Sequence, residues 1–570
     1  MNKPLKFLLF LFLVISKPDI AQPLLQFYPD GNKRSEENYK NGIMEGKSSY
    51  WYENGKLAKE GEFLEGKESG LWKAWYESGK IKSSENYLRG KRNGSCEYWY
   101  NSGIKAMECY YTRGFSDSIW VQWYENGKLK SKESFKLSRK EGDWIYYHEN
   151  GQMQSKGFFK DGLQTGSFEM WSPEGKLLEQ GNYDAGVKTG QWTSYFQTGA
   201  IKEKYHIENG EKIFDEVYDK NGKILVKGGE GNAVFYFDDG SEKCSGQLVS
   251  GRKSGIWTFL QSDGKKEAVL NFEKGKKQGD AVYFFSNGQI SASGQYLNDV
   301  KNGMWVWFRK NGKKEMEGSL LDSLQEGNWK YYHPDGKLES EGMMVKNKRE
   351  GEWKLYYRGG ELWKRGNYKA DIKHGEWITT FEDGSVFQKG AYLDGSETGE
   401  WEAYYQGGKL RDKGAYLNGK MNGLWSGWYE NGNLKYRGSY TEGIRDGEWS
   451  WFYPDAKNEK VMNYKKGEES GASSSWFPNG KLKEQGQLVD GKREGNWKFY
   501  YEEGNIFEEI NYVKGRLHGK KTTWYEHGVM MTKGAFKDGV RDGKWEQYGP
   551  KGQILNEQAF KNGKPLPKKQ

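Results

Sequence analysis

Residues 336–360 read GKLESEGMMVKNKREGEWKLYYRGG, and variants of this stretch recur every 24 residues along almost the whole chain. The opening glycine marks a turn position, often preceded by Glu-Asn. This position falls at 31, 55, 79, 103, 127, 151, 175, 199, 222, 240 and then every 24 residues to 552. Of these 23 positions 22 hold glycine, and the exception is Ala456. Such a period indicates a repeat array. We assign a structural turn role to these glycines, with the clearest examples at Gly55, Gly127, Gly151, Gly336 and Gly432.

Each repeat reads as a β-hairpin. Residues 337–345 alternate polar and apolar, a polar bend follows, and residues 352–357 are rich in aromatic side chains. Runs of this length between turns predict two strands. A helix is disfavoured because each interior glycine would cost about 1 kcal/mol. We therefore predict an all-β protein, an elongated array of antiparallel hairpins in 24-residue repeats that form one extended, twisted sheet.

The composition excludes several classes of protein. The chain has 570 residues, 78 of them glycine, and 16% are aromatic. Disordered chains are poor in aromatics, and collagen needs glycine at every third position. The net charge of +9 comes from 88 basic and 79 acidic residues that are interspersed. Because no basic stripe stands apart from the acids, we expect no nucleic-acid partner.

The first residues resemble a secretory signal. Lys3 and Lys6 precede the apolar run from Phe7 to Ile15, and Ala21-Gln22 follows. A basic start, a short apolar stretch and a small residue are typical of such signals. Nine apolar residues are fewer than the ~20 that span a bilayer, although an uncleaved anchor is the alternative. We predict export to the periplasm, cell surface or medium, with residues 1–21 removed and no transmembrane helix left.

The period breaks once, between Gly199 and Gly240, where the steps are 23 and 18 residues. We read the irregular repeat as a joint between two arrays or a kink in one. The predicted organisation is a signal peptide (1–21), a first array (22–212), an irregular joint (213–239), a second array (240–563) and a basic tail (564–570).

The turn chemistry allows two registers. Asn-Gly is typical of a two-residue type I′ loop. Proline, however, stands two residues before the turn glycine in six repeats, as at Pro334 and Pro454, which favours a type I turn with glycine in a following bulge. The two-residue loop would place Cys96 opposite Cys109 as a pair able to form a disulfide. The bulged loop, which we prefer, would place Cys96 opposite Glu108 and predicts free thiols.

Aromatic residues recur at fixed positions in the repeat. A tryptophan stands 17 residues after most turn glycines, and a tyrosine often stands three residues before the next one. These rows are either structural ladders or a platform for a ligand. The candidate binding surface comprises Trp305, Trp329, Trp353, Trp377, Trp401, Trp425, Tyr357, Tyr405 and Tyr429.

The units Gly-x-Trp-x-x-Tyr-Tyr-x-x-Gly and Gly-x-Tyr-x-x-Gly-Lys resemble MORN repeats, and more closely the bacterial MORN-variant repeats. The resemblance covers about residues 27–563. It implies an elongated antiparallel sheet that scaffolds other proteins. It also implies an antitoxin or immunity role, since many such proteins are catalogued as toxin–antitoxin antitoxins, and a phospholipid surface as a further partner.

No catalytic or metal-binding pattern accompanies the repeats. The six histidines lie outside metal spacings, and His148 and His333 replace the tyrosine before the turn. No phosphate-binding loop occurs. We expect no enzyme activity, no metal and no cofactor. The leading hypothesis is an exported, non-catalytic scaffold that binds a protein through its aromatic-rich sheet. The alternatives are a protein that binds glycans or the envelope by aromatic stacking, and an antitoxin-like protein.

Overall fold

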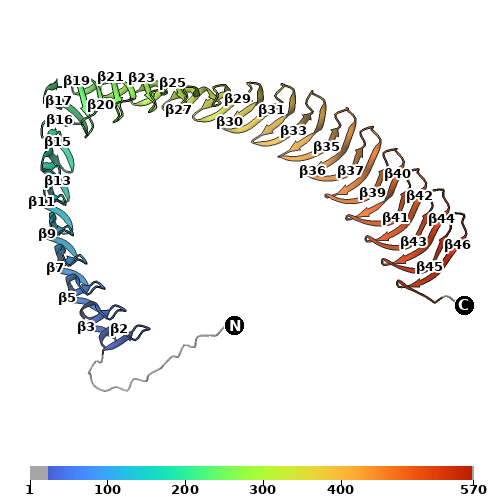
Figure 1. The fold of residues 1–570 in the computed structure, drawn as a ribbon, viewed down its shortest axis with the longest axis horizontal. Coiled ribbons are helices and arrows are strands. Elements are labelled where there is room, and N and C mark those ends of the chain that lie inside the picture. The colour runs from blue at the N-terminus through green and yellow to red at the C-terminus, as the bar shows by residue number, and fades with distance from the viewer. Residues whose placement is uncertain (1–22, 568–570) are drawn as a thin grey trace. The chain divides into compact units, whose positions relative to one another are not determined.

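The computed structural model describes residues 23–567, so the predicted signal and its cleavage site lie outside the described residues. The described chain contains 47 β-strands and no helix, which confirms the all-β prediction. Contact density divides it into two compact units, unit 1 up to Lys276 and unit 2 from Lys277. Figure 1 shows the strands in chain order, coloured from blue to red.

Unit 1 contains the strands β1 (Leu24–Phe27), β2 (Lys33–Lys40), β3 (Ile43–Trp51), β4 (Leu57–Leu64), β5 (Lys67–Trp75), β6 (Ile81–Leu88), β7 (Lys91–Trp99), β8 (Lys105–Thr112), β9 (Phe115–Trp123), β10 (Leu129–Lys136), β11 (Arg139–Tyr147), β12 (Met153–Lys160), β13 (Leu163–Trp171), β14 (Leu177–Asp184), β15 (Val187–Tyr195), β16 (Ile201–Glu208), β17 (Glu211–Tyr218), β18 (Ile224–Lys227), β19 (Glu230–Tyr236), β20 (Glu242–Val249), β21 (Arg252–Leu260) and β22 (Lys266–Glu273).

Unit 2 contains the strands β23 (Lys276–Phe284), β24 (Ile290–Leu297), β25 (Val300–Phe308), β26 (Lys314–Leu321), β27 (Leu324–Tyr332), β28 (Leu338–Val345), β29 (Lys348–Tyr356), β30 (Leu362–Lys369), β31 (Ile372–Thr380), β32 (Val386–Leu393), β33 (Ser396–Tyr404), β34 (Leu410–Leu417), β35 (Lys420–Trp428), β36 (Leu434–Thr441), β37 (Ile444–Phe452), β38 (Asn458–Lys465), β39 (Glu468–Trp476), β40 (Leu482–Val489), β41 (Lys492–Tyr500), β42 (Ile506–Val513), β43 (Arg516–Trp524), β44 (Met530–Lys537), β45 (Val540–Tyr548), β46 (Ile554–Lys561) and β47 (Lys564–Pro565).

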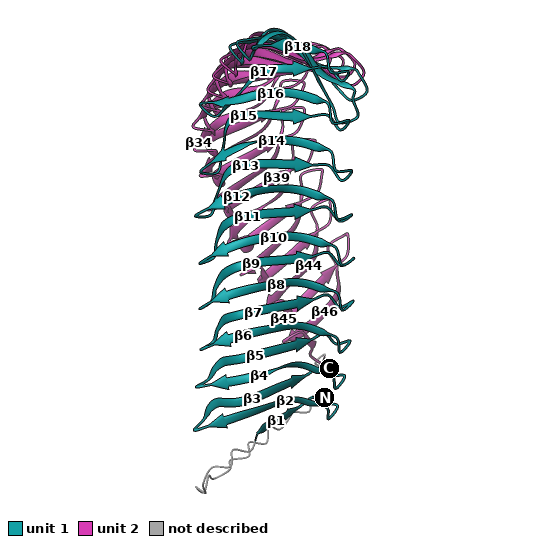
Figure 2. Ribbon diagram, turned by 90° about the vertical axis from the view of Figure 1, so that its left-hand side faces the viewer, with its two compact units in different colours: residues 1–276 teal, residues 277–570 magenta. Residues whose placement is uncertain are grey.

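Within each unit every strand pairs antiparallel with its neighbours in sequence, as β7 does with β6 and β8. The teal strands of unit 1 in Figure 2 alternate in direction and are joined by turns along two edges. The predicted array of β-hairpins is therefore confirmed. Since a one-layer sheet has no separate core, its stability depends on contacts between neighbouring strands.

The turn positions found in the sequence lie along one edge and have the bulged geometry. In the β7–β8 hairpin the Gly103 N–H donates to the Tyr100 carbonyl at 2.8 Å, and the Tyr100 N–H donates to the Ile104 carbonyl at 2.8 Å. Gly103 has φ +95°, the left-handed conformation of a type I turn followed by a glycine bulge. This confirms the preferred turn.

The opposite edge consists mainly of two-residue turns. Arg113 and Gly114, with φ of +53° and +90°, connect the paired residues Thr112 and Phe115. Positive φ at both central residues defines the type I′ turn. The bend predicted after residue 345 is such a turn, formed by Lys346 and Asn347, both with positive φ.

The predicted register beyond the bulged turn is wrong, because each hairpin contains a second bulge. Trp99 lies opposite Lys105, as a three-residue loop requires, but Tyr98 lies opposite Met107, so Ala106 is extra. The additional residue restores the register of a two-residue loop. Cys96 therefore lies opposite Cys109 and not opposite Glu108.

A third irregularity explains the glycine that precedes each tryptophan by two residues. Gly342 lies opposite Trp353, yet Met343 lies opposite Glu350, so Gly351 and Glu352 are unmatched. Gly351 has φ +64°, which a side chain would disfavour. The bulge brings the tryptophan onto the preceding strand.

The buried layer consists mainly of indole rings, most of which lie on a glycine. A Cβ added to Gly342 would lie 2.4 Å from the Trp353 ring, and the indole Nε1 donates to the Met343 carbonyl at 3.0 Å. In every repeat we call the place that corresponds to Trp353 the Trp position. The place that corresponds to Gly342, opposite it on the preceding strand, is the opposing position. The ring lies on a glycine in the same way at Gly61–Trp72, Gly181–Trp192, Gly246–Trp257, Gly294–Trp305, Gly318–Trp329, Gly366–Trp377, Gly390–Trp401, Gly414–Trp425, Gly438–Trp449, Gly486–Trp497 and Gly534–Trp545.

Where the Trp position holds another residue, the opposing position is usually filled by a larger side chain. Met462 lies opposite Ser473 and Ile510 opposite Lys521, and both apolar side chains are buried. Glu85 likewise lies opposite Cys96. The space that a tryptophan ring would fill is thus taken by a larger side chain on the preceding strand, as close packing requires.

The irregular segment 213–239 lies within unit 1. Strand β18 has only four residues, and Gly228-Gly229 joins it to β19. Gly229 lies close to the backbone of Gly251. A Cβ added to Gly229 would lie 2.5 Å from the Gly251 nitrogen, so this turn has no room for a side chain there. The shortened repeat therefore keeps a hairpin form, with β18 and β19 paired antiparallel.

Candidate interaction surface

The bulged turns are linked to one another by the side chains of the Asn-Gly-Lys motif. The Asn54 Oδ1 accepts the Lys56 N–H at 3.0 Å, which closes its own turn. Its Nδ2 donates to the Glu77 carbonyl of the next turn at 3.1 Å, and the Lys56 Nζ donates to the Ser78 carbonyl at 2.8 Å. The motif therefore stacks turns along this edge, and its amide and amine groups serve neighbouring backbone.

The tyrosine row is a second ladder. The hydroxyls of Tyr357, Tyr405 and Tyr429 donate to the carbonyls of Thr380, Trp428 and Phe452 at 2.8 Å, each 23 residues ahead. The rings are half-buried. These three predicted site residues thus have their polar ends occupied by the next repeat. His148 and His333 occupy the same place, with ring nitrogens 2.9 and 3.3 Å from the corresponding carbonyl oxygens.

The tryptophans of the predicted binding surface are mostly inside the sheet. Trp305, Trp329, Trp353, Trp377 and Trp425 are at most 6% exposed, and Trp401 is half-buried. One face of each ring lies on the opposing glycine, and neighbouring rings cover much of the rest. Of the two interpretations of this row, a structural ladder or a platform for a ligand, the burial of these indoles favours the ladder. The sequence alone left both open, because the burial depends on which glycine lies opposite each ring, and hence on the bulges.

Basic side chains cover the tryptophan rings from outside. The Arg493 guanidinium lies 4.4 Å from the Trp497 ring centre and 4.9 Å from that of Phe499. Lys188 lies 3.9 Å above Trp192. Such cation–π contacts contribute roughly 0.5–2 kcal/mol each, depending on desolvation. The mixed charge in the sequence therefore includes a row of cations that close the indole layer.

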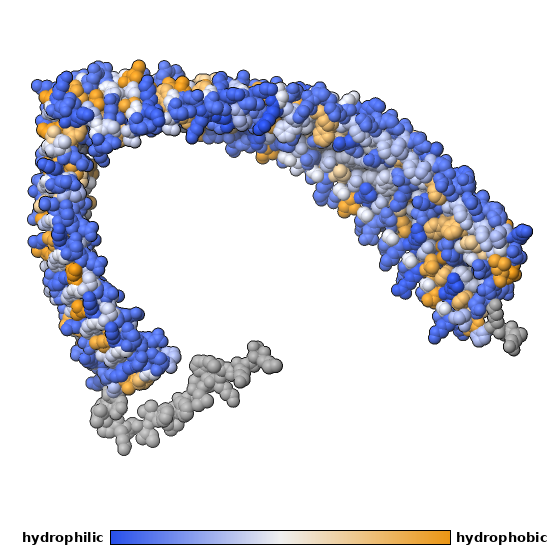
Figure 3. Space-filling model, in the orientation of Figure 1, coloured by the Kyte–Doolittle hydropathy of each residue, from blue (hydrophilic) through white to orange (hydrophobic). Residues whose placement is uncertain are grey.

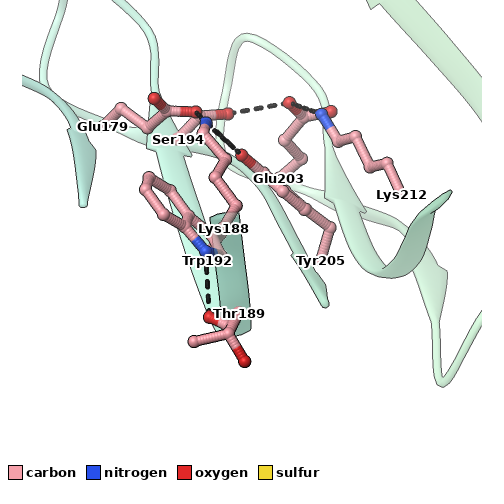
Figure 4. A network of polar contacts seen from close by, with 8 residues as sticks. All are labelled: Glu179, Lys188, Thr189, Trp192, Ser194, Glu203, Tyr205 and Lys212. Atoms are coloured by element: carbon pink, nitrogen blue, oxygen red, sulfur yellow. Dashed lines mark hydrogen bonds and ion pairs between the residues drawn. The ribbon is translucent and has the colours of Figure 1, made fainter. Parts of the chain in front are cut away.

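Figure 4 shows a network of polar contacts around one of these rings, Trp192, in strands β14 to β17 of unit 1. Glu179 accepts hydrogen bonds from the Lys188 Nζ and the Tyr205 hydroxyl, both at 2.8 Å. Glu203, 7% exposed, accepts from the Ser194 hydroxyl at 2.9 Å and the Lys212 Nζ at 2.6 Å. Every carboxylate in the network is compensated.

Tyr205 occupies an opposing position in a repeat without tryptophan. Its ring stacks on Trp192 with centres 6.3 Å apart, and Lys212 lies 3.9 Å from its centre. Burial, followed by the hydrogen bond to Glu179, raises the pKa of the Tyr205 hydroxyl well above its usual value. The Tyr205 phenol therefore stays neutral, which fits a structural role better than a role in acid–base chemistry.

The exposed side of the two-residue turns carries a further row that the sequence reading missed. Apolar side chains flank these turns and are between 36% and 61% exposed. We call them the apolar row: Ile43, Leu64, Leu88, Phe115, Leu163, Val187 and Val249 in unit 1, and Leu297, Val300, Leu321, Leu324, Ile372, Leu393, Leu417, Ile444, Val489, Val513 and Val540 in unit 2. Hydrophobic patches interrupt the mainly hydrophilic surface on the visible face of each unit (Figure 3).

Basic residues accompany the apolar row. Leu417 pairs across its turn with Lys420, Val489 with Lys492, and Val513 with Arg516. Cross-strand partners point to the same face, so each of these turns presents an apolar and a cationic group together. Other turns of the row have an uncharged partner, such as Ser396 opposite Leu393. The signal in the sequence is an apolar residue directly before or after the two turn residues.

Residues 23–567 contain no group of three or more histidine, cysteine or carboxylate side chains arranged to hold a metal ion. The same part of the chain has no helix that could cross a bilayer.

Comparison with known proteins identifies the repeat. The model of the MORN repeat variant matches thirteen segments: residues 24–41, 44–65, 68–88, 117–137, 140–161, 164–185, 325–347, 349–370, 397–418, 421–442, 469–490, 493–514 and 541–562. The chain belongs to the MORN repeat variant family. Each matched segment of this MORN-variant protein contains one bulged turn and most of the two strands that flank it, as residues 44–65 contain the turn between β3 and β4. No curated protein matches the chain.

Solved structures with some similarity include the crystal structure of TcdB2-TccC3-Cdc42, with 11% identity and a TM-score of 0.14. The alignment covers 95% of this chain and 33% of that one. A Photorhabdus luminescens Tc holotoxin pore with a mutated TccC3 has 11% identity and a TM-score of 0.13, over 94% of this chain and 32% of that one. The MORN-variant chain thus spans about a third of these chains, and such low scores carry no argument about its function.

Proposed function

We propose that this MORN-variant protein is a non-catalytic scaffold that binds another protein through the apolar row and its basic neighbours. The observation that carries the proposal is the repetition of exposed apolar side chains at successive two-residue turns. Large exposed apolar patches commonly mark sites of protein–protein interaction. The tryptophan row supports this assignment indirectly, since its contacts hold together the strands that carry these turns.

The chemistry of the row defines the partner. Each apolar group stands beside a lysine or arginine in most repeats, as at Leu417 with Lys420. A complementary surface would carry apolar side chains flanked by carboxylates. Since neighbouring repeats present an exposed apolar side chain at the same place, as Leu393, Leu417 and Ile444 do, a partner with a periodic or extended surface would contact several turns at once. Its affinity would then grow with the number of turns engaged.

Site-specific photo-crosslinking tests the proposal in the native host. A photoreactive residue at Leu393, Leu417 or Ile444 should crosslink one partner protein, whereas the same residue at Gln406 or Glu430, exposed on the bulged-turn edge, should not. The triple variant Leu393→Ser, Leu417→Ser and Ile444→Ser should abolish the complex while thermal unfolding stays unchanged. Equal crosslinking from both edges, or an intact complex with the triple variant, would refute the apolar row as the binding surface.

We also propose that the protein is exported, on the strength of the basic and apolar pattern of residues 3–22. Mass spectrometry of the protein from its host should show a new N-terminus near Gln22. An intact Met1 in the cytoplasmic fraction would contradict export, and it would leave the choice of binding surface unaffected.

A glycan-binding role would rely on a different aromatic row from the one predicted. Trp75, Trp99 and Trp123 lie three residues beyond the Trp position, so they point to the other face of the sheet, and they are half-buried. Their partial exposure is the observation that favours this second candidate. Binding on a glycan array that is lost with Trp99→Ala and kept with Leu417→Ser would select it over the scaffold.

A further inference from the structure

Cys96 and Cys109 form a pair that no other repeat possesses. Cys96 replaces the tryptophan of its repeat, and Cys109 occupies the next opposing position, where most repeats have glycine. The two residues lie directly opposite each other on β7 and β8. They are 0% and 2% exposed, and both are free thiols in the structure. The pair thus lies within the buried indole layer.

We propose that Cys96 and Cys109 are a cross-strand redox pair that oxidises to an intramolecular disulfide. Directly opposed residues on antiparallel strands have Cα and Cβ separations within the range that a disulfide bridges. The bulge at Ala106 is what creates this register, since without it Cys96 would face Glu108. The proposal rests on this pairing and is independent of the proposed scaffold function.

The surroundings of the pair favour reaction between the two sulfurs. The thiols share a hydrogen bond, which lowers the pKa of Cys96 and raises that of Cys109. One thiolate is therefore stabilised by its neighbour, as in other dithiol pairs. Arg92 lies on the same strand and is held by Glu85, with Nε and Oε2 2.7 Å apart, so the nearest carboxylate is already neutralised.

The oxidant class is a small disulfide such as oxidised glutathione. The Cys96 thiolate attacks one glutathione sulfur, and a glutathione thiolate leaves. The Cys109 thiolate then attacks the Cys96 sulfur of the mixed disulfide and displaces the second glutathione. Two protein thiols are oxidised and one glutathione disulfide is reduced, and the two protons that the protein thiols lose are taken up by the two departing glutathione thiolates, so that two glutathione thiols form. The product links the two strands of one hairpin and leaves the chain's other repeats unchanged.

Cys244 is a matched control within the same chain. It is also buried, but phenylalanines lie opposite it on both neighbouring strands, Phe235 on β19 and Phe259 on β21. A second control moves the pair by one residue to the other face. Glu97 and Glu108 are directly opposed and more exposed, so Glu97→Cys with Glu108→Cys, in a Cys96→Ser and Cys109→Ser background, should also form a link.

The experiment equilibrates the native full-length protein in glutathione buffers of increasing oxidising strength, then blocks remaining thiols and maps the peptides by mass spectrometry. We expect the loss of two hydrogen atoms, a 96–109 peptide link and a free Cys244. Three free thiols in the most oxidising buffer, while the shifted control pair or the urea-unfolded wild type becomes linked, would overturn the proposal. Stable glutathione adducts on Cys96 or Cys109, or a link to Cys244, would overturn it as well.

Discussion

At the scale of single residues, the fold depends on matched side-chain sizes at the Trp position and the opposing position: a large side chain at one requires a smaller one at the other. Trp353 fits only because Gly342 has no side chain, since any Cβ there would overlap the indole. The chain also contains the inverse solution, in which buried Met462 lies opposite Ser473. Tight packing makes such positions interdependent, and interdependent substitutions are not additive.

A double-mutant cycle tests this matching of sizes. Trp353→Ser should destabilise its hairpin by about 3–5 kcal/mol, as large aromatic truncations do. Gly342→Met should also be destabilising because it clashes with the ring. The double variant recreates the pair found at Met462 and Ser473. It should therefore be more stable than the sum of the single variants predicts, by about 2 kcal/mol. Native-state hydrogen exchange of peptides from β28 and β29 gives the free energies, and strict additivity would contradict the matching of sizes.

At the scale of the hairpin, three bulges set the register, and this is where sequence reasoning reached its limit. The bulged turn was predictable, because proline before the turn glycine and the left-handed glycine both point to it. The second bulge was not, because its extra residue has no characteristic identity: it is Ala58 in one hairpin, Ala106 in another and Trp363 in a third. A one-residue error exchanges the faces of a strand. For this reason the cysteine pairing was predicted wrongly.

The candidate site was affected by the same limit. The sequence showed the aromatic rows, but deciding between a ladder and a platform required the positions of the opposing glycines, such as Gly342. The apolar row was visible in principle, since Leu417 and Val489 directly precede two-residue turns. It was overlooked because scattered surface leucines and valines are ordinary in any protein.

Ion pairs across a hairpin make its stability depend on pH. On β33, Glu402 accepts from Lys389 at 2.8 Å and from Lys413 at 3.0 Å. The hydrogen bonds from Lys389, Tyr404 and Lys413 lower the pKa of Glu402 from 4.5 to about 2. A lowered folded-state pKa means that the stabilisation is complete above the unfolded pKa and is lost as the pH falls towards the folded one.

The variant Glu402→Gln isolates this contribution. We expect β32 to β34 to be less protected from hydrogen exchange in the variant at pH 6, by a modest amount because the carboxylate is partly solvated. The difference should shrink from about pH 4.5 and vanish near pH 2. The exposed pair formed by Lys265 and Asp263 in unit 1 gives a control, and Asp263→Asn should leave these strands unchanged. A gap between wild type and Glu402→Gln that persists at pH 2 would show that the effect is not electrostatic.

At the scale of the whole molecule, the chain is a series of repeats in which each strand contacts mainly its sequence neighbours within a unit; β17 and β19, on either side of the short strand β18, are an exception. The ladders of tyrosine and asparagine reach one repeat ahead, as the hydroxyl of Tyr429 does to the carbonyl of Phe452, whereas each tryptophan lies on the strand before its own, as Trp353 does on β28. Stability in such arrays is close to a sum of repeat and nearest-neighbour terms. The binding surface is repeated in the same way, so damage to one repeat should remain local.

Hydrogen exchange of the Trp353→Ala variant tests this claim most directly. The truncation removes the ring contacts between β28, β29 and β30 and should cost about 3–5 kcal/mol there. We expect peptides from these strands and their immediate neighbours to lose protection. Peptides from β42 to β46 and from unit 1 should exchange at wild-type rates. A uniform loss of protection along the chain would contradict the account, because it would show that the protein unfolds as one cooperative domain.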